Sequence, residues 1–229
     1  MSQRESINKL SVITSGLLLL ATVIANTSVM AENAAIVIKS QPVVPVSVRG
    51  PVGPIITTPT GAVTFEFTFG LAGGAEGAYG MLEKYKVRNP ILTVRDEFLK
   101  GLKTDPGLSN FKVHESYLDR KQAKRKNLKN TFKEPYVLQF DPGMWQMIYF
   151  LGNWKKYWSQ YMATAQLIRT SDGEKIWTGH CVVKKKNKKT APTLDELKSN
   201  ANNVFSNWAN ESGPECAAQL LKKFRSDNS

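Results

Sequence analysis

The sequence predicts an α+β fold, in which a mixed or antiparallel sheet of about five strands carries helices on one face. Two alternating segments flank an Asp-Gly turn in the last third of the chain, and helical segments with clear start signals stand on either side of them. A single pair of cysteines, Cys181 and Cys216, can join the two kinds of element. With 229 residues, 41% of them apolar, the chain can bury one core.

Residues 1–31 have the pattern of a secretory signal peptide. Arg4 and Lys9 precede an apolar stretch that is densest over residues 17–25, and Val29-Met30-Ala31 supplies small residues for cleavage. The alternative is an uncleaved membrane anchor, but polar residues interrupt the stretch, and a span needs about 20 predominantly apolar residues. No cysteine lies near the stretch, so it carries no lipidation site. The pattern predicts a periplasmic protein, either free or membrane-associated.

Residues 32–62 are predicted to form a proline-rich extended arm. Five prolines stand among valines and isoleucines, and proline removes a backbone donor and fixes φ, which disfavours a helix or a central strand. The arm is either a flexible linker or, through the alternating run at residues 42–46, a strand that docks on a partner.

The α+β domain is predicted to span residues 63–229 and to open with a strand at 63–69, where apolar and polar residues alternate. The glycine-rich segment 70–80 fits no phosphate-binding loop. Its small-xxx-small pairs indicate a closely packed helix or loop, or a segment that contacts a membrane. Asn89-Pro90 then caps and begins a helix.

The middle of the chain alternates between strands and turns. Strands are predicted at residues 111–118, 136–140 and 144–150, with a turn at Asp141-Pro142-Gly143 between the last two. Residues 119–133 are strongly basic, which is typical of a solvated helix or loop.

The last third predicts a hairpin followed by helices. Strands at residues 157–169 and 175–183 flank the turn Ser171-Asp172-Gly173-Glu174. Thr193 and Glu196 form a capping box that begins a helix. Gly213-Pro214 is expected to break that helix before a last one that carries Cys216.

Export would place the two cysteines in an oxidising compartment, so we predict a structural disulfide between Cys181 and Cys216. A redox-active pair is not expected, because a C-x-x-C spacing is absent.

The sequence carries no pattern of catalytic chemistry. It has two histidines, His114 and His180, and lacks zinc-binding spacings, nucleophile elbows and S-x-x-K motifs. The chain is therefore predicted to be a non-enzyme, with no catalytic, cofactor-binding or metal-ligating residues.

Seven aromatic residues within 145–161 surround two lysines. Such residues can stack on sugars, lie at a lipid interface or anchor a protein partner, or they can simply fill the core. Since loops carry function more often than core strands do, the predicted partner surface comprises Trp154, Lys155, Lys156, Tyr157 and Trp158.

A second candidate surface is a run of lysines after the hairpin. The net charge is +12, and about +11 would remain after signal cleavage. Export excludes nucleic acid and leaves anionic lipid, lipopolysaccharide, cell-wall polymer or an acidic protein as partners. The candidate anion patch comprises Lys184, Lys185, Lys186, Lys188 and Lys189.

Four motifs together resemble an uncharacterised group of Gram-negative envelope proteins. They are Val94-Arg95-Asp96-Glu97-Phe98-Leu99, Tyr161–Ile168, Gly173–Cys181 and Ala191–Leu197, followed by the late Cys216. More distantly, the hairpin is similar to those of the curli-secretion lipoprotein and of lipoprotein activators of penicillin-binding proteins. That resemblance implies a helix-covered mixed sheet used in assembly or partner regulation, although the lipobox cysteine of those lipoproteins is missing here.

These observations predict an exported interaction or assembly module that binds another envelope component. The alternative is an electrostatic binder of anionic envelope lipid or glycan.

Overall fold

The computed structural model describes residues 33–50, 54–58, 61–64 and 82–229. The predicted signal peptide, the glycine-rich segment and residues 65–69 of the first predicted strand lie outside the described residues. The elements are α1 (Ala34–Ser40), β1 (Val44–Val48), β2 (Pro54–Thr58), β3 (Gly61–Thr64), α4 (Pro90–Leu102), β4 (Phe111–Val113), η1 (Arg125–Asn127), α5 (Leu128–Thr131), β5 (Tyr136–Phe150), β6 (Asn153–Arg169), β7 (Lys175–Lys185), α6 (Leu194–Ser199) and α7 (Ala201–Asp227).

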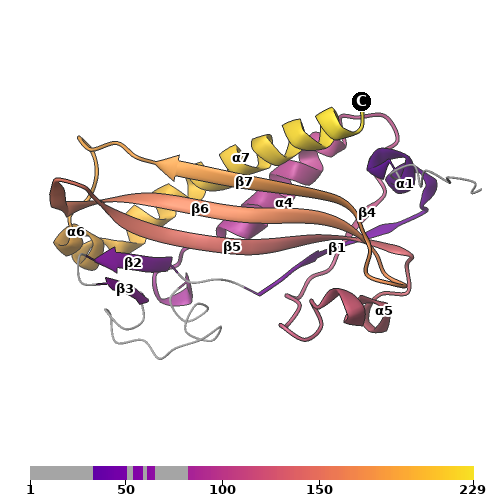
Figure 1. Ribbon diagram of the computed structural model, residues 1–229, viewed down its shortest axis with the longest axis horizontal. Coiled ribbons are helices and arrows are strands. Elements are labelled where there is room, and N and C mark those ends of the chain that lie inside the picture. The colour runs from indigo at the N-terminus through magenta and orange to yellow at the C-terminus, as the bar shows by residue number, and fades with distance from the viewer. Residues whose placement is uncertain (1–32, 51–53, 59–60, 65–81) are drawn as a thin grey trace, which may run out of the picture. The chain divides into compact units, whose positions relative to one another are not determined.

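The strands form one mixed, seven-stranded sheet in the order β3-β2-β5-β1-β4, with β6 paired to β5 and β7 paired to β6 (Figure 1). Strands β5, β6 and β7 are long and antiparallel, whereas β1 and β2 pair with β5 in parallel, one beside each half of it. The predicted α+β class is confirmed, with more strands than the five expected.

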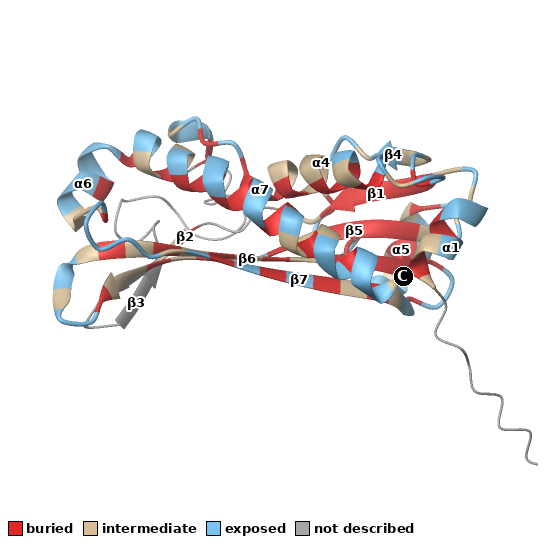
Figure 2. Cartoon of the chain, turned by 90° about the horizontal axis from the view of Figure 1, so that it is seen from above, coloured by how far each residue is buried: buried red, intermediate tan, exposed pale blue. Residues whose placement is uncertain are grey.

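Helices α4 and α7 cover one face of the sheet, and their buried sides face it (Figure 2). Strand β6 buries every second residue from Tyr157 to Leu167, and β7 does the same from Trp177 to Val183. This is the alternation that the sequence predicts for both strands. Helix α4 begins where expected, because the side chain of Asn89 accepts a hydrogen bond from the backbone N–H of Ile91 at 3.2 Å.

Aromatic rings link these two layers. The ring of Phe98 in α4 lies 5.6 Å from Phe140 of β5, 6.0 Å from Trp177 of β7 and 6.1 Å from Phe224 of α7, measured between centroids. One side chain of α4 thus contacts α7 and two strands of the sheet.

The predicted disulfide is also confirmed. Cys181 of β7 and Cys216 of α7 are bonded, with their Cα atoms 5.2 Å apart. Both are buried, and the bond joins the edge strand β7 to the helix that covers it.

A short helical segment covers part of the other face. Leu118, Ala123, Leu128 and Phe132 pack there against Val137 of β5 and Ile168 of β6, apart from the main core. The basic stretch 119–133 is therefore a solvated turn-and-helix segment, as predicted, but it also has a buried side. The expectation of helices on one face only is incomplete for this reason.

The prediction that residues 32–62 avoid helix and central strand is wrong for their described part. Asn33 caps α1, and every residue of β1 is buried between β4 and β5. Pro45 pairs in register with Lys112 of β4, but the hydrogen bonds to that strand involve its neighbours Val44 and Val46. Pairs with β5 begin only at Val46, so the missing N–H of Pro45 removes no ladder bond.

Two predicted breaks do not occur. Strand β5 runs through Asp141-Pro142-Gly143 with a bulge between Pro142 and Met144, because β6 pairs with it on both sides. Helix α7 continues through Pro214, which lies on its exposed face, so the carbonyl that the proline leaves unpaired faces water. Gly213 is buried, and a Cβ there would lie 2.7 Å from Thr93 of α4, so the glycine permits close helix packing.

Candidate functional site

The turn between β5 and β6 exposes two large apolar side chains. Leu151 is 87% exposed and Trp154 is 62% exposed. We call residues 151–154 the hairpin tip. Gly152 has a φ of +78°, the left-handed region that favours glycine in a tight turn. Trp154 contacts Tyr149 at 6.3 Å between ring centroids, which supports the indole without burying it.

A bulge in β6 explains why the tip projects. Tyr149 pairs with Tyr157, but the next residue, Phe150, pairs with Asn153. Residues 154–156 consequently have no registered partner on β5, and a bulge of this kind re-aims side chains away from the sheet. On the other side, Lys156 forms an isolated bridge to Thr193, just before α6.

The five residues of the predicted partner surface separate into different environments. Trp154 and Lys155 are exposed, whereas Tyr157 is buried and Trp158 is half-buried. Burial raises the pKa of the Tyr157 hydroxyl above its usual range. Tyr157 belongs to the face of β6 that packs under the helices, because the regular alternation of that strand starts with it.

The lysine run lies next to these aromatic residues. The Nζ of Lys186 stands 5.3 Å from the centre of the Trp158 ring, a cation–π contact. The Nζ of Lys156 donates to the backbone carbonyls of Lys188 and Lys189 at 3.3 and 3.2 Å. The two surfaces that the sequence predicts separately are therefore adjacent.

One lysine of the run is held by acidic residues. The Nζ of Lys185 lies 2.8 Å from a carboxylate oxygen of Glu215 and 3.5 Å from one of Glu211, both in α7. The hydrogen bond to Glu215 raises the pKa of Lys185 above its usual value. The other four members, Lys184, Lys186, Lys188 and Lys189, are exposed.

A cleft of about 570 Å³ lies between the end of β7, the loop before α6 and the first half of α7. Tyr157, Val204 and Trp208 supply apolar walls, and Lys184 and Lys186 supply positive charge at its edge. Such a mixture can hold an apolar side chain beside an acidic one.

Sequence reasoning missed the exposure of Leu151 and the place of Val204 and Trp208 in the lining of the cleft. Leu151 precedes a Gly-Asn pair, which is a hairpin signal, so its place at a turn could have been inferred. Val204 and Trp208 follow the capping box at helical spacing, but nothing in the sequence shows that this helix face borders a cleft.

Metal-ligand clusters are absent from the described part of the chain. No group of three or more His, Cys, Asp or Glu side chains in it can hold a metal ion. His180 bonds to Thr164 at 3.0 Å, and His114 lies near Ser116. None of the described helices combines the length and apolar character needed to cross a bilayer.

No protein-family model and no curated protein matches this chain. Among solved structures, a Xanthomonas campestris protein of the DUF330 family shares 15% identity over 82% of this chain and 91% of its own, with a TM-score of 0.39. A Neisseria meningitidis lipoprotein shares 15% identity over 72% of this chain and 99% of its own, with a TM-score of 0.31. The PelC dodecamer of Paraburkholderia phytofirmans shares 13% identity over 80% of this chain and 90% of its own, with a TM-score of 0.34. The resemblance to curli-secretion and penicillin-binding-protein activator lipoproteins stays a prediction.

Proposed function

We propose that this chain is an exported, non-catalytic module of the bacterial envelope that binds another envelope protein through its hairpin tip. The observation that carries the proposal is the pair of exposed apolar side chains at one turn, Leu151 and Trp154. Exposed leucine and tryptophan side chains lose contact with water when a partner covers them, and tryptophan is enriched among residues that dominate binding energies.

The surroundings of the tip support a protein partner. Trp154 rests on Tyr149, so its indole is already positioned and less conformational entropy is lost on binding. Lys155 is exposed next to Trp154, and Lys156 bonds to the backbone of the lysine run. Positive charge near the tip would favour a partner with acidic residues around an apolar pocket. The disulfide supports export, because such bonds persist in oxidising compartments.

The second candidate function is electrostatic binding of anionic envelope lipid or glycan. It is favoured by the four exposed lysines of the run, of which Lys184 and Lys186 line the cleft and Lys186 also lies over the ring of Trp158. Lys185 would contribute little, because Glu211 and Glu215 already pair with it.

We expect Trp154→Ala to abolish capture of the partner from detergent-solubilised envelopes. Loss of a central tryptophan typically costs 2 kcal/mol or more of binding free energy, roughly thirtyfold in Kd. The tagged protein would be washed first at low and then at high salt, and the retained proteins would be quantified. High salt should leave the partner bound, since contacts of desolvated apolar groups are little screened.

The matched control is Ile36→Ala, because Ile36 is also an exposed apolar residue, 67% exposed, but lies on α1. It should capture the partner as the wild type does. Equal capture by all three proteins would overturn the proposal. A different result would favour the second candidate: only lipid or glycan is recovered, and it is lost at high salt. It would also be lost when glutamine replaces the four exposed lysines, Lys184, Lys186, Lys188 and Lys189.

A further inference from the structure

A basic groove lies on the sheet face opposite α4 and α7, between the segment 120–126 and the β6–β7 turn. We call it the Gln139 groove, and its volume is about 670 Å³. Its floor comes from Gln139 of β5 and Gln166 of β6, which are paired in register. Its two walls touch, since a Cβ on Gly173 would lie 3.0 Å from the Cβ of Arg125. The groove is thus formed by packed elements.

Positive charge dominates the groove. Its cationic side chains are those of Arg49, Arg120, Lys124, Arg125, Lys126 and Lys175. The two carboxylates that line it are already engaged: Asp141 pairs with Arg49 at 2.9 Å, and Asp172 pairs with Arg169 at 3.1 Å. Within the described part of the chain, Arg120, Lys124, Lys126 and Lys175 have no ion pair, so a ligand with several negative charges would find unpaired cations here.

Gln139 indicates that the ligand needs a hydrogen-bond donor as well as negative charge. Its side chain is buried, with 5% exposed, and its Nε2 donates to the carbonyl of Ala123 at 3.3 Å. Its Oε1 is buried and has no hydrogen-bond partner among the described residues. A buried acceptor without a donor is costly and calls for an explanation. A carboxylate or a fully ionised phosphate cannot donate to it, and the surrounding cations favour the ionised form and would repel an ammonium group. A hydroxyl group meets the requirement.

We propose that the Gln139 groove binds an anionic saccharide, a sugar that carries more than one phosphate or carboxylate group. The anionic groups pair with the arginines and lysines of the wall, and the Gln139 side chain turns toward the groove so that its Oε1 accepts from a sugar hydroxyl. Among the described residues, no aromatic side chain lines the groove, so recognition rests on ion pairs and hydrogen bonds and not on stacking against a ring.

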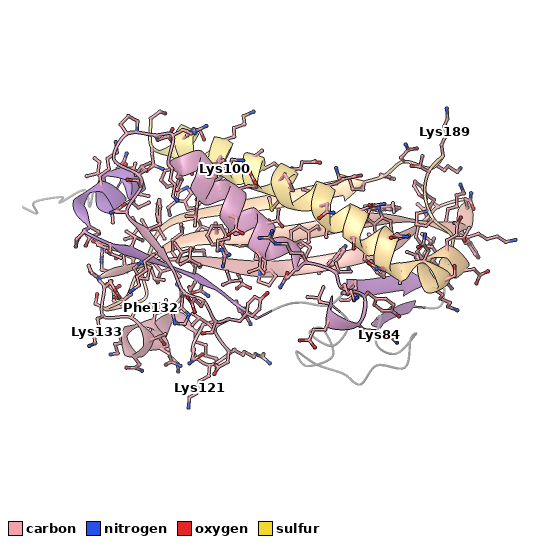
Figure 3. The ribbon with its side chains drawn as sticks, turned by 180° about the vertical axis from the view of Figure 1, so that it is seen from behind. Lys84, Lys100, Lys121, Phe132, Lys133 and Lys189 are labelled. Carbon is pink, nitrogen blue, oxygen red and sulfur yellow. A yellow bond between two sulfur atoms is a disulfide. The ribbon has the colours of Figure 1, made fainter. Side chains whose placement is uncertain are left out.

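This site is distinct from the hairpin tip. Figure 3 shows Lys121, in the segment that forms the groove wall, and Lys189, in the lysine run, at opposite ends of the sheet. The two sites can therefore be tested separately, and failure of one leaves the other standing.

Isothermal titration of the full chain with glucose 1,6-bisphosphate, pyrophosphate and glucose tests the proposal. The sugar bisphosphate should bind at least about tenfold more tightly than pyrophosphate, although pyrophosphate has the denser charge, because the sugar keeps its hydroxyl donors whereas pyrophosphate loses its proton when it pairs with the cations of the wall. Glucose should not bind, and affinity for the bisphosphate should fall as salt is raised. Equal or tighter binding of pyrophosphate, or no binding of the sugar bisphosphate, would overturn the proposal.

Two sets of variants locate the site. Replacing Arg120, Lys124 and Lys126 by glutamine should weaken binding of the sugar bisphosphate by at least about tenfold. These side chains are exposed, so the protein should stay folded. Replacing Lys184, Lys186 and Lys188 by glutamine removes the same charge elsewhere and should change Kd less than about twofold. Equal losses in both sets would mean that net charge, and not the groove, holds the ligand.

A third variant and a second form of ligand complete the test. Gln139→Met removes the buried acceptor at similar volume. It should weaken binding of the sugar bisphosphate while leaving binding of pyrophosphate unchanged.

Vesicles that display a phosphorylated disaccharide headgroup distinguish the source of the saccharide. Binding to these vesicles, but not to phosphatidylglycerol vesicles, would assign a lipid-linked sugar. Equal binding to both vesicles would contradict saccharide recognition.

Discussion

Replacement of Phe98 by alanine is expected to lower the free energy of unfolding by about 3–5 kcal/mol. The side chain is fully buried, and its ring contacts Phe140, Trp177 and Phe224. Truncation would leave a cavity at the point where α4, α7 and the sheet meet, and the neighbouring rings are too well packed to fill it. Urea unfolding followed by circular dichroism measures the loss as a lower midpoint at unchanged slope.

Leu92→Ala is the control for this prediction, because Leu92 lies on the same helix but is only partly buried. Its truncation should cost clearly less than that of Phe98. Similar losses for the two variants would contradict the assignment of Phe98 to the centre of the core.

Loss of the disulfide is expected to lower the free energy of unfolding by about 3–4 kcal/mol, from the entropy of closing the loop in the unfolded chain. Cys181 and Cys216 are 35 residues apart in sequence. The double variant Cys181→Ala/Cys216→Ala avoids a free thiol. Comparing it with the wild type in urea, with and without a thiol reductant, measures the loss.

The reductant supplies an internal control. It should destabilise the wild type by about the same amount as the double substitution does, and it should have no effect on the double variant. An effect of the reductant on the double variant, or none on the wild type, would contradict a stabilising bond between β7 and α7.

Helix starts and turns could be predicted from the sequence wherever the residues that determine them are close together in the chain. The Thr193–Glu196 capping box and the Asn89 cap both formed as predicted. So did the β6–β7 hairpin at Gly173, whose φ is +76°. In each of these, the determining contacts lie within a few residues of one another.

The errors arose where long-range pairing overrode a local signal. Pro45 suggested an arm, yet β4 and β5 enclose β1 on both sides. Gly213-Pro214 suggested a helix end, yet buried residues continue on both sides of it in α7, from Phe205 to Phe224. A sequence shows that proline disfavours a structure, but not how much packing energy opposes that preference.

The candidate site was predictable only in part. The aromatic and lysine clusters could be identified from composition, but their adjacency depends on Lys156 reaching the carbonyls of Lys188 and Lys189. The burial of Tyr157 and the exposure of Leu151 depend on the bulge between β5 and β6. The Gln139 groove could not be predicted from the sequence, because its floor and its walls come from segments that are distant in sequence.

Photo-crosslinking in living cells tests the central claim most directly, that the hairpin tip binds an envelope protein. A photoreactive amino acid would replace Leu151 at the tip or, as the control, Ile36 on α1, since both positions are exposed. We predict a discrete crosslinked protein band from position 151 that is absent from position 36 and disappears when Trp154→Ala is added. Crosslinks to lipid alone from position 151, or the same bands from both positions, would contradict it.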